Sequence, residues 1–148
     1  MKGKLVQGII RSLDAAAGLL HASPATPAHL LTGKKGEEEA YFYLRRHGYT
    51  MVARNWRSPR HRGELDLVGW DGDVLCFIEV KTRTTREVKP AEAAVDQHKR
   101  RELAAVARDF RRRLPAAPAL RFDIVSVYCE PDAASPDITL FKNAFSLP

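Results

Sequence analysis

The sequence predicts an α/β protein in which a central mixed sheet is flanked by helices, with the element order α-β-β-β-α-β-β. Two segments, 36–47 and 91–114, carry apolar residues at helical spacing, whereas five others show the short apolar or alternating runs typical of strands. A length of 148 residues suits one core, and 45% hydrophobic with 28% charged residues are ordinary globular values.

The N-terminal segment, residues 1–32, is predicted to form an extra amphipathic helix followed by a linker, ahead of a main domain at 33–148. Apolar residues recur at helical spacing between Leu5 and Leu20, and a proline-rich stretch follows at 23–27. Arg11 and Asp14 interrupt the apolar run, so we expect neither a signal peptide nor stable membrane insertion. The apolar stripe would pack against its own domain or contact a partner, with membrane-surface binding a third alternative.

The first helix of the main domain is predicted over 36–47. Ala40, Tyr41 and Leu44 follow Glu37 at i+3, i+4 and i+7, which puts this acid on the apolar face of the helix. A purely structural explanation is also available, because acids near a helix start interact favourably with the helix dipole. Gly48 is predicted to end the helix.

Three strands are predicted next, over 49–56, 64–70 and 74–82. A tight turn at Asp71-Gly72-Asp73 makes the second and third antiparallel neighbours. A basic loop, residues 58–63, joins the first two. Such loops can contact phosphates, although many are merely exposed.

A long helix is predicted over 91–114, followed by strands over 121–128 and 138–141. Leu103, Val106, Phe110 and Leu114 form its core-facing stripe, and Lys99 falls on the same stripe. A lysine there could extend harmlessly to solvent or could reach a functional site and hold a phosphate.

Three charged residues stand out on the second and third strands. Asp66 lies on one strand, and Glu79 and Lys81 share a face of the next because strand side chains alternate. The turn can bring Asp66 close to Glu79. Charge beside a hydrophobic core is costly unless it is paired or binds a metal. The arrangement therefore predicts a Mg²⁺ or Mn²⁺ site, and a solvated ion pair is the alternative.

The charge balance favours an anionic partner. The net charge is +6 and the isoelectric point is near 9.6, which suits nucleic acid or a membrane surface. The positive charge is clustered in residues 54–62 and 99–113. Cys76 and Cys129 lack metal-ligand spacing; a buried free thiol at Cys76 and a reducing, cytoplasmic location are expected.

Several short motifs together identify a family resemblance. Gly63-Glu64-Leu65-Asp66 is followed by Phe77-Ile78-Glu79-Val80-Lys81, and these runs are accompanied by Gly36-Glu37, Asn55, Lys99, Arg121-Phe122-Asp123 and Asn143-Ala144-Phe145. The series resembles the PD-(D/E)xK nuclease superfamily and, within it, the uncharacterised YraN-like bacterial family (UPF0102), which is similar to Holliday-junction resolvases. Leu65 stands where the superfamily name has proline. The resemblance runs from about residue 33 to residue 145 and implies a restriction-endonuclease-like core.

The resemblance also implies roles for particular residues. Asp66 and Glu79 would bind the metal, with the Val80 carbonyl as a further oxygen ligand. Lys81 would position water or stabilise the transition state, and Glu37 would act as the superfamily's helical acid. Backbone phosphates of the nucleic acid, expected to be DNA, would be held by Arg60, Arg62, Arg83 and Lys99.

The predicted activity is hydrolysis of phosphodiester bonds in DNA, with branched or junction DNA as candidate substrates. Junction cleavage would require two sites related by two-fold symmetry and hence a homodimer, for which the sequence has no direct signal. The alternative is a non-catalytic nucleic-acid-binding protein with a nuclease-like fold. A third interpretation is a protein-interaction module that works through the N-terminal helix.

Overall fold

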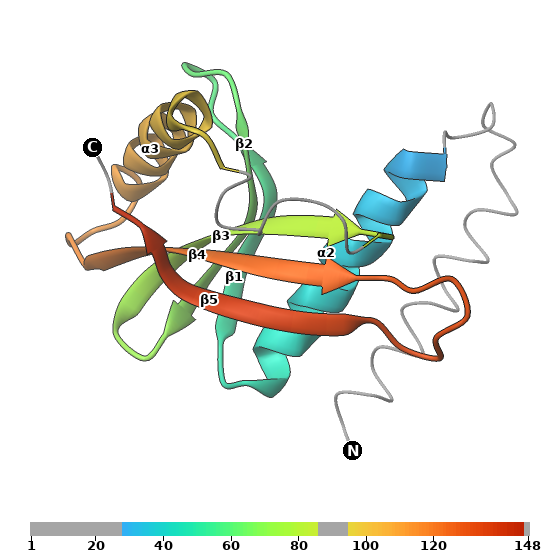
Figure 1. Ribbon diagram of the computed structural model, residues 1–148. Helices are drawn as coiled ribbons and strands as arrows, with labels where there is room; N and C mark the ends of the chain where they lie inside the picture. Colours follow the sequence, from blue (N-terminus) through green and yellow to red (C-terminus); the bar gives the residue numbers. More distant parts are fainter. Residues whose placement is uncertain (1–27, 86–94, 147–148) are drawn as a thin grey trace, which may run out of the picture.

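The computed structural model describes residues 28–85 and 95–146 (Figure 1). The predicted N-terminal amphipathic helix lies outside the described residues. The element order within them is α-β-β-β-α-β-β, as predicted. The elements are α2 (Ala28–Arg46), β1 (Thr50–Arg57), β2 (Glu64–Asp71), β3 (Val74–Arg83), α3 (Gln97–Arg111), β4 (Ala119–Tyr128) and β5 (Asp137–Phe145).

The predicted start of α2 was wrong, whereas the predicted start of α3 at residue 91 lies outside the described residues, of which 95 and 96 precede the helix. α2 begins at Ala28 rather than at Gly36 and crosses the expected boundary between residues 32 and 33. Glycine disfavours helix interiors, but Gly36 lies inside this helix because a β-carbon there would lie 1.8 Å from the Thr82 hydroxyl oxygen. α3 begins at Gln97, since Asp96 caps it by accepting from the Lys99 amide at 2.9 Å.

The five strands form one mixed sheet in the order β1-β2-β3-β4-β5. β3 and β4 are parallel, and every other neighbouring pair is antiparallel. The predicted turn between β2 and β3 is confirmed, with Asp71 opposite Val74 and Gly72 at a φ of 60°. α3 lies in the connection between the two parallel strands, as such a crossover requires. This arrangement confirms the predicted fold class and is consistent with a restriction-endonuclease-like core.

The two helices cover opposite faces of the sheet (Figure 1). Alternate residues of β3 show this directly. Leu75 and Phe77 pack in a core cluster with Leu103 and Val106 of α3. A second cluster packs Cys76 and Ile78 with Ala40 and Leu44 of α2. Cys76 is a free, fully buried thiol, as predicted, and burial raises its pKa to about 12.

A polar network is buried in the part of the sheet built by β4 and β5. Asp123 is fully buried, and its two oxygens accept from the Arg121 guanidinium at 2.8 and 2.9 Å, the Tyr49 hydroxyl at 3.2 Å and the Asn143 amide at 2.9 Å. Arg121 also donates to Asp71 at 2.7 Å. The Asn143 amide becomes available because its φ of 53° lies in a register shift of β5 opposite Asp123. β5 continues past this shift to Phe145, beyond its predicted end at residue 141.

Candidate active site

The centre of the site is the point where β2 and β3 separate. Their pairing ends at Leu67 opposite Ile78, so the next opposed positions would be Asp66 and Glu79. Instead of continuing the ladder, the Val80 amide donates to the Asp66 carboxylate at 2.8 Å. The two predicted metal-binding acids therefore meet at the open end of a strand pair, as their sequence positions suggested.

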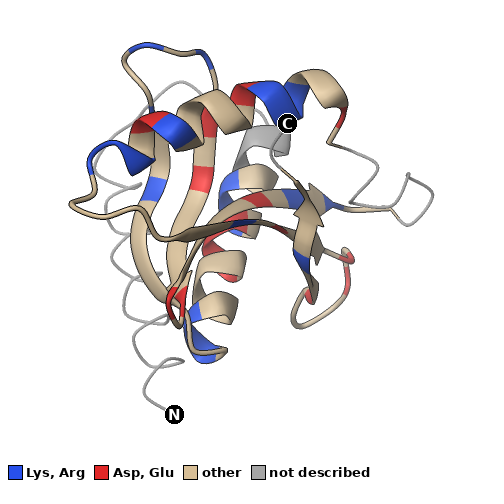
Figure 2. Cartoon of the chain, turned by 90° about the vertical axis from the view of Figure 1, so that its left-hand side faces the viewer, with Lys and Arg blue, Asp and Glu red and all other residues tan. Residues whose placement is uncertain are grey.

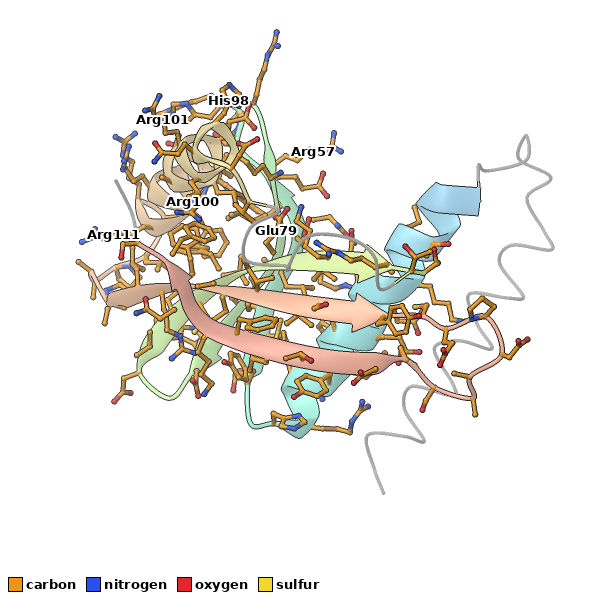
Figure 3. All side chains as sticks on the ribbon, viewed as in Figure 1. Arg57, Glu79, His98, Arg100, Arg101 and Arg111 are labelled. Atoms are coloured by element: carbon orange, nitrogen blue, oxygen red, sulfur yellow. The ribbon has the colours of Figure 1, made fainter. Side chains whose placement is uncertain are left out.

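Glu79 is nearly buried, with 6% of its surface exposed. Its Oε1 oxygen lies 3.1 Å from the Lys81 ammonium and 3.7 Å from that of Lys99. Its Oε2 oxygen is buried and has no hydrogen-bond partner within the described part of the chain. Figure 3 shows Glu79 near the middle of the molecule, below α3. The expected shared face of Glu79 and Lys81 is confirmed, and Lys99 does extend from α3 to this carboxylate.

Asp66 is electrostatically linked to its neighbours. Its pKa is raised to about 8, first by burial and then by the negative charges of Glu79 and Glu37; the Val80 hydrogen bond and Lys99 oppose the rise. The charged form of Asp66 is therefore disfavoured at this position. Carboxyl groups whose pKa is raised by burial and by a neighbouring carboxylate are enriched at functional sites.

Glu37 reaches this region because α2 packs very closely on β3. The absent side chain of Gly36 allows the approach to Thr82, and Glu37 is the next residue. Its Oε2 oxygen accepts from the Asn55 amide at 2.8 Å. Glu37 is thus close enough to influence the pKa of Asp66, while a hydrogen bond from β1 holds its carboxylate.

Asn55 is the residue whose role the sequence did not predict, although it belongs to the motifs of the resemblance. Its φ of 47° places it in the left-handed region, which asparagine tolerates better than most residues. Its side-chain amide donates both to Glu37 and, at 2.9 Å, to Glu64. Glu64 also pairs with Arg57. Asn55 therefore holds two acids in place, and in the sequence only its membership of the motif series singled it out.

The predicted nucleic-acid-binding residues are not all brought together. Lys99 and Arg62 line one open pocket of about 500 Å³, which we call the near groove. Arg60 belongs to the same loop as Arg62, but its side chain lines a different recess, where it lies 4.0 Å from Asp109. Arg83 ends β3 two residues after Lys81 and so shares its strand face. The near groove is lined by Arg57, Ser58, His61, Arg62, Gly63, Glu64 and Lys99.

The positive charge is concentrated beside the site. Lys and Arg residues gather along α3 and on the β1–β2 connection, above strands that carry acids (Figure 2). Arg57 projects on the Glu79 side of α3, whereas His98 and Arg101 project from its other side (Figure 3). A polyanion approaching Glu79 would meet this basic surface first.

The acids fit a cation only in part. Asp66 and Glu79 offer hard carboxylate oxygens, one of them buried without a partner, which is the donor type that Mg²⁺ and Mn²⁺ take. Among residues 28–85 and 95–146, however, no group of three Asp, Glu, His or Cys side chains is arranged to hold a metal. Two protein carboxylates with remaining ligands from water and substrate are still a normal arrangement for Mg²⁺.

Comparison with known proteins matches the chain to one protein family. A model described as "Uncharacterised protein family UPF0102" matches residues 36–127, a range that contains every predicted site residue. A UPF0102 protein of Koribacter versatilis (strain Ellin345) is 54% identical over 138 residues, covering 93% of this chain and 92% of that protein. A UPF0102 protein of Solibacter usitatus (strain Ellin6076) is 49% identical over 114 residues, covering 76% and 84%.

Proposed function

The chain belongs to the uncharacterised protein family UPF0102, and we propose that it is a divalent-metal-dependent endonuclease that hydrolyses phosphodiester bonds in DNA. One observation carries the proposal. Two acids from adjoining strands meet where their pairing ends, with lysines beside one of them and one buried oxygen that has no partner among the described residues. Buried acids without full hydrogen bonding are unfavourable, so their presence calls for a ligand.

In this proposal Asp66 and Glu79 would hold Mg²⁺ or Mn²⁺. When bound, the cation would withdraw electron density from the phosphate and make an attacking water more acidic. Lys81, 3.1 Å from Glu79, would stabilise the negative charge that develops on the phosphate oxygens. Glu37, fixed by Asn55, would orient the attacking water or receive its proton.

The basic residues would hold the substrate backbone. Lys99 contacts Glu79 and also lines the near groove with Arg62, so a phosphate bound there would lie next to the reacting one. Arg83 would contact the strand from the end of β3. Phosphate contacts position a nucleic acid without reading its sequence, which is compatible with a substrate defined by structure, such as branched or junction DNA.

A non-catalytic nucleic-acid-binding protein is the second candidate. It is favoured by the lack of a three-residue metal cluster in the described segments. The contacts of Lys81 and Lys99 with Glu79 favour it too, because they compensate one carboxylate oxygen without any metal. No helix within the described residues is long and apolar enough to cross a membrane; a cytoplasmic location and a homodimer stay predictions.

Two variants separate the candidates. Asp66→Asn keeps the side-chain shape but removes a ligand charge. It should abolish cleavage and also the stabilisation by Mn²⁺ that raises the melting temperature of the wild type. That stabilisation is about 1.4 kcal/mol when Mn²⁺ is at ten times its dissociation constant. Lys81→Ala should keep the Mn²⁺ shift but lower the cleavage rate by about 100-fold.

The assay would use branched, single-stranded and duplex DNA with Mn²⁺, and both variants should still bind DNA. A wild type that binds DNA but shows neither a Mn²⁺-dependent melting shift nor cleavage would overturn the nuclease and support the binder. Equal cleavage by wild type and Asp66→Asn would reject Asp66 as a metal ligand.

A further inference from the structure

A second basic pocket lies on the other side of the 58–63 loop from the near groove. It has a volume of about 240 Å³ and is lined by Pro59, Arg60, Asp109, Arg112 and Arg113. We call it the far pocket. None of its lining residues lines the near groove, so the loop separates two distinct basic recesses.

The loop that divides the two recesses is fixed to α3. Asp109, only 7% exposed, accepts a hydrogen bond from the Ser58 hydroxyl. The Ser58 oxygen in turn accepts from the backbone amides of Arg60 at 3.0 Å and His61 at 3.1 Å. One buried carboxylate on a helix therefore sets the shape of the loop, and a preformed loop loses less conformational entropy when it binds.

The far pocket carries more positive than negative charge. Arg112 donates to Asp109 at 3.3 Å, and Arg60 lies 4.0 Å from the same oxygen. The Arg113 guanidinium stacks over the Trp56 ring at 5.1 Å from its centre. Three guanidinium groups thus line a recess with one carboxylate, which Ser58 already engages, and this leaves a surplus of two positive charges. Guanidinium groups bind phosphate oxygens well because their planar donors match phosphate geometry.

From this arrangement we propose that the far pocket binds a second backbone phosphate of the nucleic acid whose reacting phosphate lies at Asp66 and Glu79. The inference deepens the proposed function and rests on it for the identity of the ligand. The strand would pass from Lys99 and Arg62 in the near groove, across the loop, to Arg112 and Arg113. The substrate would then need several nucleotides on one side of the cleaved bond.

The test compares two double variants of α3 that remove the same charge. Arg112→Ala/Arg113→Ala alters the far pocket, whereas Arg108→Ala/Arg111→Ala removes two exposed arginines that line neither recess. Figure 3 shows Arg111 projecting from the C-terminal end of α3. Binding would be measured by fluorescence anisotropy in EDTA, so that no cleavage occurs, with a single strand of about 20 nucleotides and with a dinucleotide.

The far-pocket variant should bind the long strand about tenfold more weakly than the control variant. Its plot of log K against log salt should be shallower by about one unit, the loss expected for one phosphate contact. The dinucleotide should bind both variants equally, because it is too short to reach the far pocket. Arg60→Ala, which leaves α3 unchanged, should reproduce part of the loss and covers the case in which the double variant does not fold.

Equal salt slopes for the two double variants would overturn the far-pocket proposal while leaving the nuclease proposal intact. A wild type that binds neither oligonucleotide would overturn both. Circular dichroism of each variant establishes that the fold is retained.

Discussion

Two groups of acids lie in one sheet, each with one buried member, and their oxygens are hydrogen-bonded to different degrees. Around Asp123 every carboxylate oxygen has donors: a guanidinium, a hydroxyl and a backbone amide. At the other group, Asp66 receives one amide hydrogen bond and Glu79 leaves an oxygen unpartnered. The first group has the complete hydrogen bonding of a permanent ion pair. In the second group one carboxylate oxygen has no donor among the described residues. Full satisfaction suits a structural role, whereas incomplete satisfaction is what the proposed metal site requires of its acids.

The pKa values express the same contrast. Hydrogen bonds from Lys142 and Arg121 lower the pKa of Asp71, so its charge is stabilised by the fold. Burial and Glu79 raise the pKa of Asp66, so its charge is destabilised there. A cation or a proton can relieve that destabilisation. The two groups should therefore respond to substitution with opposite signs.

The largest effect is expected at Asp123. Asp123→Ala would leave Arg121 buried without its main partner and the Asn143 amide without an acceptor. Stability should fall by about 3–5 kcal/mol, as for other broken buried pairs. Urea denaturation would measure this loss. Asp71→Ala is the matched control, because Asp71 is partly exposed and contacts the same arginine; it should lose about 1 kcal/mol. Similar losses for both would remove the distinction between buried and exposed members of the network.

A smaller effect of opposite sign is expected at Asp66. Asp66→Asn removes the repulsion with Glu79 while its carbonyl can still accept from the Val80 amide. Without divalent cations at pH 8, stability should rise by about 2 kcal/mol, the magnitude of a poorly compensated buried polar group. Thermal melting in EDTA would measure it. A variant less stable than the wild type would show that Asp66 has a structural role like that of Asp123.

The sequence predicted the fold order and the central site from local signals. Strand alternation and the turn at Gly72 were enough to bring Asp66 next to Glu79 and to put Lys81 on the same face. Helical spacing was enough to put Lys99 on the side of α3 that meets the sheet. These are short-range patterns, and the structure preserves them.

The remaining features depend on contacts between residues distant in sequence. Gly36 lies inside a helix because of Thr82, and Asn55 joins Glu37 to Glu64 through a positive φ. Arg60 and Arg62 were both predicted to bind phosphates. Their side chains line different recesses on the two sides of their loop, which Asp109 of α3 fixes. No periodicity in the sequence encodes such three-way contacts.

Per pH unit, the smallest effect is the change in the free energy of unfolding that titration of Asp66 should cause. Its pKa is about 8 in the folded state against an ordinary value of 3.8, so between those values the folded protein holds a proton that the unfolded chain has released. Stability must then decrease as pH rises from about 4 to about 8 and become level above it. A difference of one whole bound proton corresponds to a slope of about 1.4 kcal/mol per pH unit, which is the upper limit for this group.

Wild type and Asp66→Asn should be melted in EDTA across this pH range, because their difference isolates the Asp66–Glu79 pair from every other titrating group. The difference should increase with pH and stop increasing near pH 8. Saturating Mn²⁺ should abolish or reverse it in the wild type, since a bound cation replaces the proton. A difference that is constant with pH would mean that Asp66 is charged throughout. The fold would then stabilise the charged form of Asp66 as it stabilises that of Asp123, and the contrast between the two groups would be wrong.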